Sequence, residues 1–242
     1  MSDFSNIPYL TTRQMIEVDR LMIEEYGIQL IQTMENAGRH LADLAVRRFL
    51  DGDPVGKSIV ILAGSGGNGG GALVCARNLH NWGAEEVVIL TKSVEQLTGA
   101  VLYQAKILQA SKIEISSASD LKKVLALDLI IDGLIGYSLQ GAPRGTAAEL
   151  IRWANQQNKP IMALDLPSGL DATTGEVFQP AIQAVATLTL ALPKIGLQTA
   201  QENVVGELYL ADIGVPPLLY ANPSLNLQVD PIFSQERVIR LF

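Results

Sequence analysis

The chain has 242 residues, of which 48% are hydrophobic and 18% charged, and its formal net charge is -7. Such a composition is typical of a globular domain with a full core and excludes a disordered or fibrous chain. No group of Lys and Arg extends beyond a pair, which argues against nucleic acid as a partner. We expect a single domain over residues 1-242.

The sequence also bears on the compartment. The first eight residues lack the basic and apolar regions of a secretory leader, and no apolar stretch is long enough to span a bilayer. The lone cysteine, Cys75, cannot form an internal disulfide, which is compatible with a reducing environment. We therefore expect a cytoplasmic protein with no membrane partner, in which Cys75 packs in the core.

Hydrophobic periodicity predicts the elements in chain order. Residues 1-50 hold two helices, the first capped near Thr12 and ended by Gly27. Short apolar runs then alternate with helical patterns. We expect strands near 58-63, 87-91, 128-132, 161-165, 186-192 and 207-211, and helices near 71-82, 94-110, 118-124 and 146-157.

This alternation predicts the fold class. It indicates an α/β, Rossmann-like three-layer sandwich, with a mostly parallel sheet, helices on both faces and an N-terminal helical layer. The core would cover residues 58-217. Residues 218-242 have weak periodicity and would form a tail that wraps the surface or leads elsewhere.

A glycine-rich segment follows the first predicted strand. Residues 64-71 contain six glycines within eight positions, directly before a helical pattern. Glycine lets the backbone press against a ligand, and the N-terminus of the following helix attracts negative charge. A nucleotide or another phosphorylated ligand is therefore the first candidate, although such glycines can also serve only a tight turn and close helix packing.

Two standard phosphate motifs fit this chain poorly. Residues 51-58 resemble a P-loop, but their glycines are one residue too close and they precede a strand. Gly64, Gly66 and Gly69 match G-x-G-x-x-G in a strand–turn–helix setting. An ordinary NAD site would have an acidic residue at the end of the second strand, where this chain has Thr91-Lys92. The sequence therefore makes an ordinary nicotinamide dehydrogenase improbable.

Polar residues follow two later strands. Asp165 stands at the end of the strand near 161-165, and Ser168 follows shortly after; Asp132 ends the strand near 128-132. A carboxylate there could be a general acid or base, and Asp132 and Ser168 could supply hard oxygen ligands to a cation. Each aspartate taken alone could equally close a turn or cap a helix.

Several segments together resemble the NAD(P)H-hydrate epimerase family, whose domain is also known as YjeF N-terminal. The resemblance runs from about Leu10 to Pro217. It rests on residues 10-15 with Asp19, residues 34-39, the glycine segment, residues 132-138, residues 165-171 and residues 211-216.

The resemblance implies a Rossmann-like fold, a homodimer, and epimerisation of the R and S hydrates of NADH and NADPH. It assigns a potassium ion, one per subunit, to Asn68, Asp132 and Ser168, and an acid/base role to Asp165. Residues matching the family's substrate contacts are Gly67, Asn68, Gly69, Gly70, Gly71, Gly136, Tyr137, Ser138, Leu139, Gln140, Gly141, Ala142 and Asp165. The substrate would be a small molecule, hydrated NADH or NADPH.

One departure from the family leaves an alternative open. Relatives carry Asn-Asn-Gly-Gly-Asp-Gly where this chain has Gly67-Asn68-Gly69-Gly70-Gly71-Ala72, so an Asn and an Asp are replaced by Gly67 and Gly71. A buried carboxylate has partners arranged around it, and its loss disturbs them. The alternative is a catalytically impaired ligand-binding or scaffolding protein on the same fold.

Overall fold

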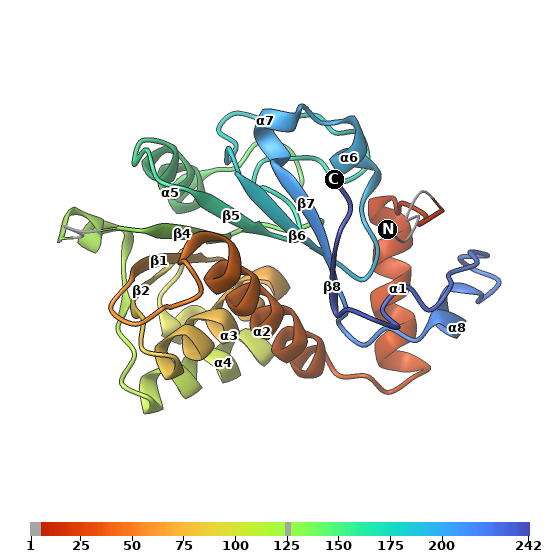
Figure 1. Ribbon diagram of the computed structural model, residues 1–242, viewed down its shortest axis with the longest axis horizontal. Helices are drawn as coiled ribbons and strands as arrows, with labels where there is room; N and C mark the ends of the chain where they lie inside the picture. Colours follow the sequence, from red (N-terminus) through yellow and green to blue (C-terminus); the bar gives the residue numbers. More distant parts are fainter. Residues whose placement is uncertain (1–5, 124–126) are drawn as a thin grey trace.

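A computed structural model describes residues 6-123 and 127-242, and its centre is one twisted eight-stranded sheet (Figure 1). The strand order is β3-β2-β1-β4-β5-β6-β7-β8, and all neighbours pair in parallel except β7 and β8. The strands are β1 Ser58–Ala63, β2 Glu85–Leu90, β3 Ile115–Ser116, β4 Leu129–Gly133, β5 Ile161–Leu164, β6 Ala186–Leu190, β7 Glu207–Ala211 and β8 Val238–Arg240. The order reverses between β1 and β4, which makes their carboxyl ends a topological switch point.

Helices cover both faces of the sheet. The α-helices are α1 Thr12–Glu24, α2 Leu30–Phe49, α3 Gly67–Asn81, α4 Gly99–Ala110, α5 Gly145–Asn155, α6 Ile195–Thr199, α7 Glu202–Val205 and α8 Pro217–Tyr220, with 3-10 helices η1 Val94–Gln96 and η2 Ala118–Lys123. In Figure 1, α2, α3 and α4 lie on the opposite side of the sheet from α5. Over residues 6-123 and 127-242, no helix is both long and apolar enough to cross a bilayer.

The central strands are buried on both faces. Ile59, Ile61 and Ala63 of β1 belong to the core cluster under α2, α3 and α4, whereas the alternating Val60 and Leu62 belong to the cluster under α5. Two-sided burial explains the continuous apolar runs of these strands. The predicted three-layer α/β fold with its mostly parallel sheet is confirmed.

Three predicted helices have different bounds in the structure. The helix expected at 71-82 begins earlier, at Gly67, so the glycine segment forms its first turn. The helix expected at 94-110 is divided into η1 and α4, because Leu97 and Thr98 between them have extended backbones, with ψ of 154° and 165°. The helix expected at 118-124 is the 3-10 helix η2, which ends at Lys123, and residue 124 lies outside the described part.

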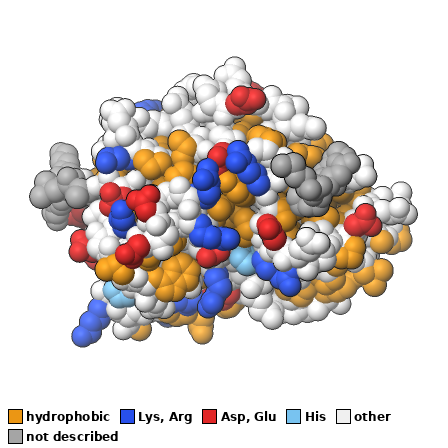
Figure 2. All heavy atoms as spheres, viewed as in Figure 1, with side chains coloured by type: hydrophobic (Ala, Val, Ile, Leu, Met, Phe, Trp, Pro, Cys, Tyr) orange, Lys and Arg blue, Asp and Glu red, His pale blue; other side chains and the backbone are white. Residues whose placement is uncertain are grey.

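The tail contributes to the sheet. β8 pairs antiparallel with β7, so residues 238-240 extend the edge that a purely parallel core would leave open. Arg240 of β8 and Arg48 of α2 both contact Glu207 of β7, at 3.2 and 2.7 Å. Basic and acidic side chains are interspersed over the face drawn in Figure 2.

The closest helix contact joins α2 to α3. A Cβ atom added to Gly38 of α2 would lie 2.4 Å from the carbonyl oxygen of Gly71 and 2.5 Å from Cβ of Val74. Glycine at position 38 therefore lets the two helix backbones touch. This contact holds the first turns of α3, which carry the glycine segment, against the N-terminal layer.

We predict that Gly38→Ala lowers the free energy of unfolding by about 1–3 kcal/mol, because the added methyl group overpacks this contact. Gly67→Ala is the matched control, since a Cβ there meets nothing within 4 Å. Urea unfolding measures both variants. Equal midpoints for the two would show that the α2–α3 contact is not tight.

Candidate functional site

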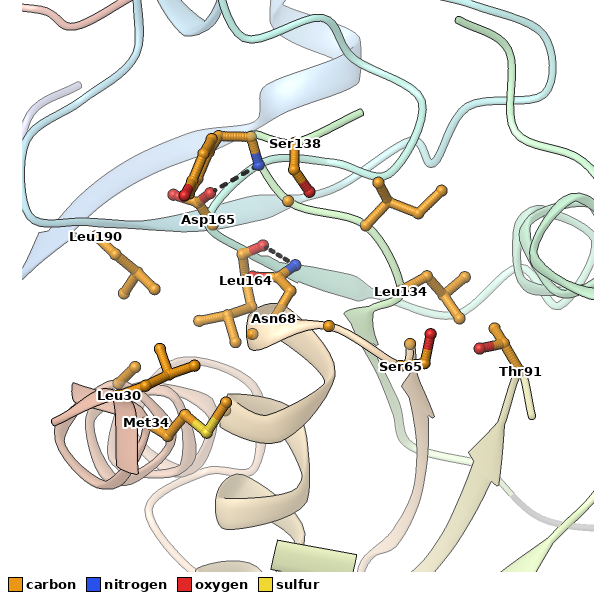
Figure 3. Close-up of a pocket in the computed structure, with 18 of the residues that line it drawn as sticks. Leu30, Met34, Ser65, Asn68, Thr91, Leu134, Ser138, Leu164, Asp165 and Leu190 are labelled. Carbon is orange, nitrogen blue, oxygen red and sulfur yellow. Dashed lines mark hydrogen bonds between the residues drawn. The ribbon is translucent and has the colours of Figure 1, made fainter. Parts of the chain in front are cut away.

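A cavity of ≈ 720 Å³ lies at the carboxyl edge of the sheet (Figure 3). Its wall combines the segments that follow four neighbouring strands, with Lys92 after β2, Asn68 after β1, Tyr137 after β4 and Asp165 after β5. Ligands bind at this place in open α/β sheets. The cavity is therefore the candidate functional site.

Glycines let the turn after β1 sit close to β4. A Cβ at Gly64 would lie 2.0 Å from the carbonyl oxygen of Leu134, and one at Gly69 would lie 1.9 Å from the carbonyl oxygen of Gly64. Both glycines are thus required by backbone packing. Gly66 and Gly67 have nothing within 4 Å of an added Cβ, and both line the cavity at the N-terminus of α3. This part of the turn leaves room for a ligand and presents helix amides to it.

Asn68 links the glycine turn to β5. Its Nδ2 donates to the carbonyl oxygen of Leu164 at 2.8 Å (Figure 3), while its Oδ1 accepts no hydrogen bond within the described residues. A Cβ at Gly136 would lie 3.2 Å from that Oδ1 and 3.0 Å from Oδ2 of Asp165. The absence of a side chain at Gly136 therefore leaves a space that Asn68 and Asp165 border.

Asp132 and Ser168 form a fully buried pair behind the cavity wall. Oδ1 of Asp132 accepts from the Ser168 hydroxyl at 2.7 Å and from the Leu134 amide at 3.1 Å, and Oδ2 accepts from the Ser168 amide at 2.8 Å. Burial raises the pKa of Asp132 to about 6, although these hydrogen bonds oppose the shift. No ion pair joins Asp132 to a cationic side chain of the described residues.

Asp165 carries the most constrained carboxylate of the cavity. Its φ of 67° lies in the left-handed region, which is unusual for a residue with a side chain and is found where the surroundings hold it. Oδ2 accepts from the Tyr137 amide at 3.1 Å, and Oδ1 accepts from Nζ of Lys194. Asp165 is 3% exposed and Lys194 is 0% exposed, so the pair is shielded from water.

Lys194 is held by two elements as well as by Asp165. Its Nζ donates to the Leu190 carbonyl at 2.8 Å, and its backbone makes a parallel bridge with Leu10, just before α1. A buried ammonium is expensive unless it is paired and hydrogen-bonded. Here both conditions are met.

Asp19 of α1 and Tyr137 form a second hydrogen-bonded pair at the cavity. The Tyr137 hydroxyl donates to Asp19, and both residues line the cavity. Burial raises the pKa of Asp19 and, with the charge of Asp19, that of Tyr137. The hydrogen bond between the two residues fixes the tyrosine ring at the cavity wall.

The structure brings together only part of the predicted site. Gly67, Asn68, Gly71, Gly136, Tyr137, Ser138 and Asp165 line the cavity, whereas Gly69, Gly70, Leu139, Gln140, Gly141, Ala142 and the two predicted cation ligands Asp132 and Ser168 are outside its lining. Gly70 faces Met34 of α2, since a Cβ there would lie 2.4 Å from the methionine methyl carbon. The predicted contacts of residues 139-142 with a ligand stay predictions.

Sequence reasoning gave no role to Lys194 or Asp19. Lys194 follows β6 at the same sheet edge that made Asp165 a candidate, so the same rule applied to one more strand would have found it. Asp19 is on a helix that precedes the sheet, and only the folded chain places it at the cavity.

The oxygen atoms of the predicted cation site suit a hard monovalent ion. The described residues contain no group of three or more His, Cys, Asp or Glu that could hold a metal. Potassium does not need one, because amide, hydroxyl and carboxylate oxygens suffice for hard cations. Asn68 Oδ1 without a hydrogen bond and the buried Asp132 without a cationic partner fit such an ion.

Comparison with known proteins agrees with this architecture. The family profile described as YjeF-related protein N-terminus matches residues 30–196. The crystal structure of the yeast protein YNL200c superposes with a TM-score of 0.83 at 25% identity, covering 97% of this chain and 100% of the yeast chain. The fold and site define a Rossmann-like domain with a ligand cavity at its switch point.

Named relatives identify the family more closely. A protein of Dehalogenimonas lykanthroporepellens named NAD(P)H-hydrate epimerase is 40% identical over 89% of this chain and 86% of its own length. One of the same name from Rhodopirellula baltica is 33% identical over 89% and 88%. A bifunctional NAD(P)H-hydrate repair enzyme of Moorella thermoacetica is 37% identical, and the match spans 42% of its length. The chain belongs to the NAD(P)H-hydrate epimerase family.

Proposed function

We propose that this protein is an isomerase that interconverts the R and S forms of hydrated NADH and NADPH, and so repairs damaged nicotinamide nucleotides. Relatives at 40% and 33% identity over most of both chains carry the name of this activity. The observation that carries the proposal is the position of Asp165. A carboxylate with a buried lysine partner lines a cavity of ≈ 720 Å³, which the N-terminus of α3 also lines.

Inversion of the hydrated ring carbon requires the hydroxyl to leave and return. The Asp165–Lys194 pair donates a proton to the hydroxyl oxygen, the C–O bond breaks with loss of water, and the lone pair of the ring nitrogen stabilises the resulting cation. Water then adds to the opposite face and returns a proton to the pair. Each step is ordinary general acid–base catalysis by a positioned carboxylate.

The remaining cavity residues would bind and orient the substrate. The amides at the N-terminus of α3 would hold a pyrophosphate oxygen, since helix N-termini attract anions. Tyr137, which Asp19 fixes, would lie along a ring of the substrate. Leu139, Gln140, Gly141 and Ala142 would contact the substrate if their loop closes over it.

A potassium ion, one per subunit, would be held by Asn68, Asp132 and Ser168. When bound, it would supply a fixed positive charge beside the reacting part of the substrate. Asp132 would then have the cationic partner that its buried carboxylate lacks, and Asn68 would offer its Oδ1. Asp165 stays responsible for proton movement.

We expect purified protein with potassium to convert the slow hydrate epimer far faster than the spontaneous reaction, as followed by chromatography. Asp165→Asn should reduce kcat by about 10²–10⁴-fold, the usual contribution of a general acid or base. Asp51→Asn is the control, because the Asp51 side chain is 93% exposed and outside the cavity. A wild-type rate equal to the spontaneous one, in the presence of potassium, would refute the proposed function.

The departure at Gly71 has a structural counterpart. A Cβ added to Gly71 would lie 2.8 Å from Cδ2 of Leu164, so the leucine side chain occupies the space that an aspartate would need. Both residues line the cavity. An apolar side chain thus fills this part of the wall in place of the family carboxylate. This favours an active enzyme over the impaired scaffold.

Gly71→Asp should therefore lower the epimerase activity instead of raising it, because Leu164 must move and a charge enters an apolar wall. Gly71→Ala serves as the steric control and should change stability by less than about 1 kcal/mol, because the added Cβ meets only the terminal Cδ2 of Leu164, which borders the cavity. Gly67→Asn, in open space, should leave the unfolding midpoint unchanged. An increase of activity in Gly71→Asp would instead support the alternative of a decayed site.

We also propose a homodimer that uses the N-terminal layer. Ile16 and Ile23 lie seven residues apart in α1 and are 56% and 44% exposed, and Leu30 at the start of α2 is 41% exposed. Residues seven apart share a helix face, which makes an apolar stripe for a second copy. Sedimentation at micromolar concentration should give the dimer mass, and Ile16→Asp should give monomers. A monomeric wild type would exclude this arrangement.

The proposed compartment is the cytoplasm. Cys75 is fully buried, and burial raises the pKa of its thiol, so the thiol is protonated and unreactive. A structural thiol of this kind suits a reducing environment, where damaged NADH and NADPH would be the small-molecule partners.

A further inference from the structure

Two cationic side chains at the cavity rim have no partner among residues 6-123 and 127-242. Lys92, directly after β2, and Arg144, directly before α5, both line the cavity and are exposed. Within the described residues, neither side chain makes a hydrogen bond or an ion pair. In a chain of net charge -7, two free cations at one cavity indicate a ligand with several negative charges.

The strand order places Lys92 far from the reacting group. Lys92 follows β2 and Asp165 follows β5, and the order β2-β1-β4-β5 separates them by three strand spacings, about 14 Å. The glycine turn after β1 and residues 134-138 after β4 lie between them. Figure 3 shows the same spatial order across the cavity, from Thr91 through Ser65 and Asn68 to Asp165. A dinucleotide with its nicotinamide at Asp165 therefore has its adenosine near Lys92.

The end of β2 is where Rossmann-like sites read the adenosine ribose. An acidic residue there binds the 2′-hydroxyl of NAD, whereas a basic residue accommodates the 2′-phosphate of NADP. The chain has Thr91-Lys92 at this place. The nearest acid in sequence is Glu95, whose pKa is lowered by a hydrogen bond from its own backbone amide and by one from Ser93, and it does not line the cavity.

We propose that Lys92 binds the 2′-phosphate of the adenosine ribose, so that this site prefers hydrated NADPH to hydrated NADH. The inference rests on the proposed function, because it assigns a preference to the same site. Nζ of Lys92 supplies a positive charge that the NADH hydrate, with only a 2′-hydroxyl, cannot use fully.

Arg144 has a different role in the same arrangement. It stands at the N-cap of the 11-residue helix α5, and Thr146 and Ala147 of the first turn line the cavity beside it. A guanidinium and a helix N-terminus together favour a phosphate group. Since Arg144 follows β4, closer to Asp165 than Lys92 in strand order, it contacts the pyrophosphate that both substrates share.

Kinetics with the NADH and NADPH hydrates test the separate roles of Lys92 and Arg144. Wild type should have a larger kcat/KM for the NADPH hydrate than for the NADH hydrate. Lys92→Gln should lower the ratio of these two kcat/KM values about tenfold, which corresponds to about 1.4 kcal/mol. Arg144→Gln should lower both values by a similar factor. Lys106→Gln is the matched control, because Lys106 is an exposed lysine of α4 outside the cavity, and it should keep the wild-type ratio. An unchanged ratio in Lys92→Gln would overturn the proposal.

A binding measurement separates this inference from the activity. Calorimetry on the full chain should show adenosine 2′,5′-bisphosphate binding at least tenfold more tightly than adenosine 5′-monophosphate, with the difference lost in Lys92→Gln and weakened by salt. Equal affinities in an active enzyme would contradict the role of Lys92 and leave the epimerase function standing. Tighter binding of adenosine 2′,5′-bisphosphate by a protein without epimerase activity would support the role of Lys92 and contradict the proposed function.

Discussion

The buried ion pair between Asp165 and Lys194 is the interaction on which the site depends. It joins the ends of β5 and β6, the segment before α1 through the Leu10 bridge, and the loop after β4 through the Tyr137 amide. Replacing a buried pair by apolar side chains is often neutral or stabilising, so its retention is poorly explained by stability alone. The φ of 67° at Asp165 supports the proposed acid/base role, because strained residues cluster at active sites.

Close backbone approaches place the other half of the site against this pair. Gly64 lets the turn after β1 touch Leu134 after β4, Gly69 lets α3 pack against Gly64 within that turn, and Gly38 lets α2 contact α3. Asn68 then reaches the carbonyl oxygen of Leu164, one residue before Asp165. The same packing explains why a family carboxylate can be absent at Gly71, because Leu164 fills that space and the wall stays closed.

Much of this architecture could be predicted from periodicity and from the rule that ligands bind at strand ends. All six predicted strands are present, since most of their residues are apolar or buried. The start of α3 at Gly67 and the strand β8 could not be read from the sequence. Glycine has low helix propensity, so tertiary contacts alone place Gly69 and Gly70 in a helix, and β8 is three residues long and pairs only with an edge.

The site, too, has residues that could be predicted from the sequence and residues that only the folded chain identifies. Asn68, Tyr137 and Asp165 could be found because they follow strands, whereas Lys194 received no role, because its complete burial is set only by the folded chain. The most direct test of the account is a crystal structure with bound NADP⁺ and potassium. We predict the nicotinamide ring beside Asp165, the 2′-phosphate at Lys92, and cation density at Asn68, Asp132 and Ser168. A dinucleotide bound in the opposite direction, or outside this cavity, would contradict the account.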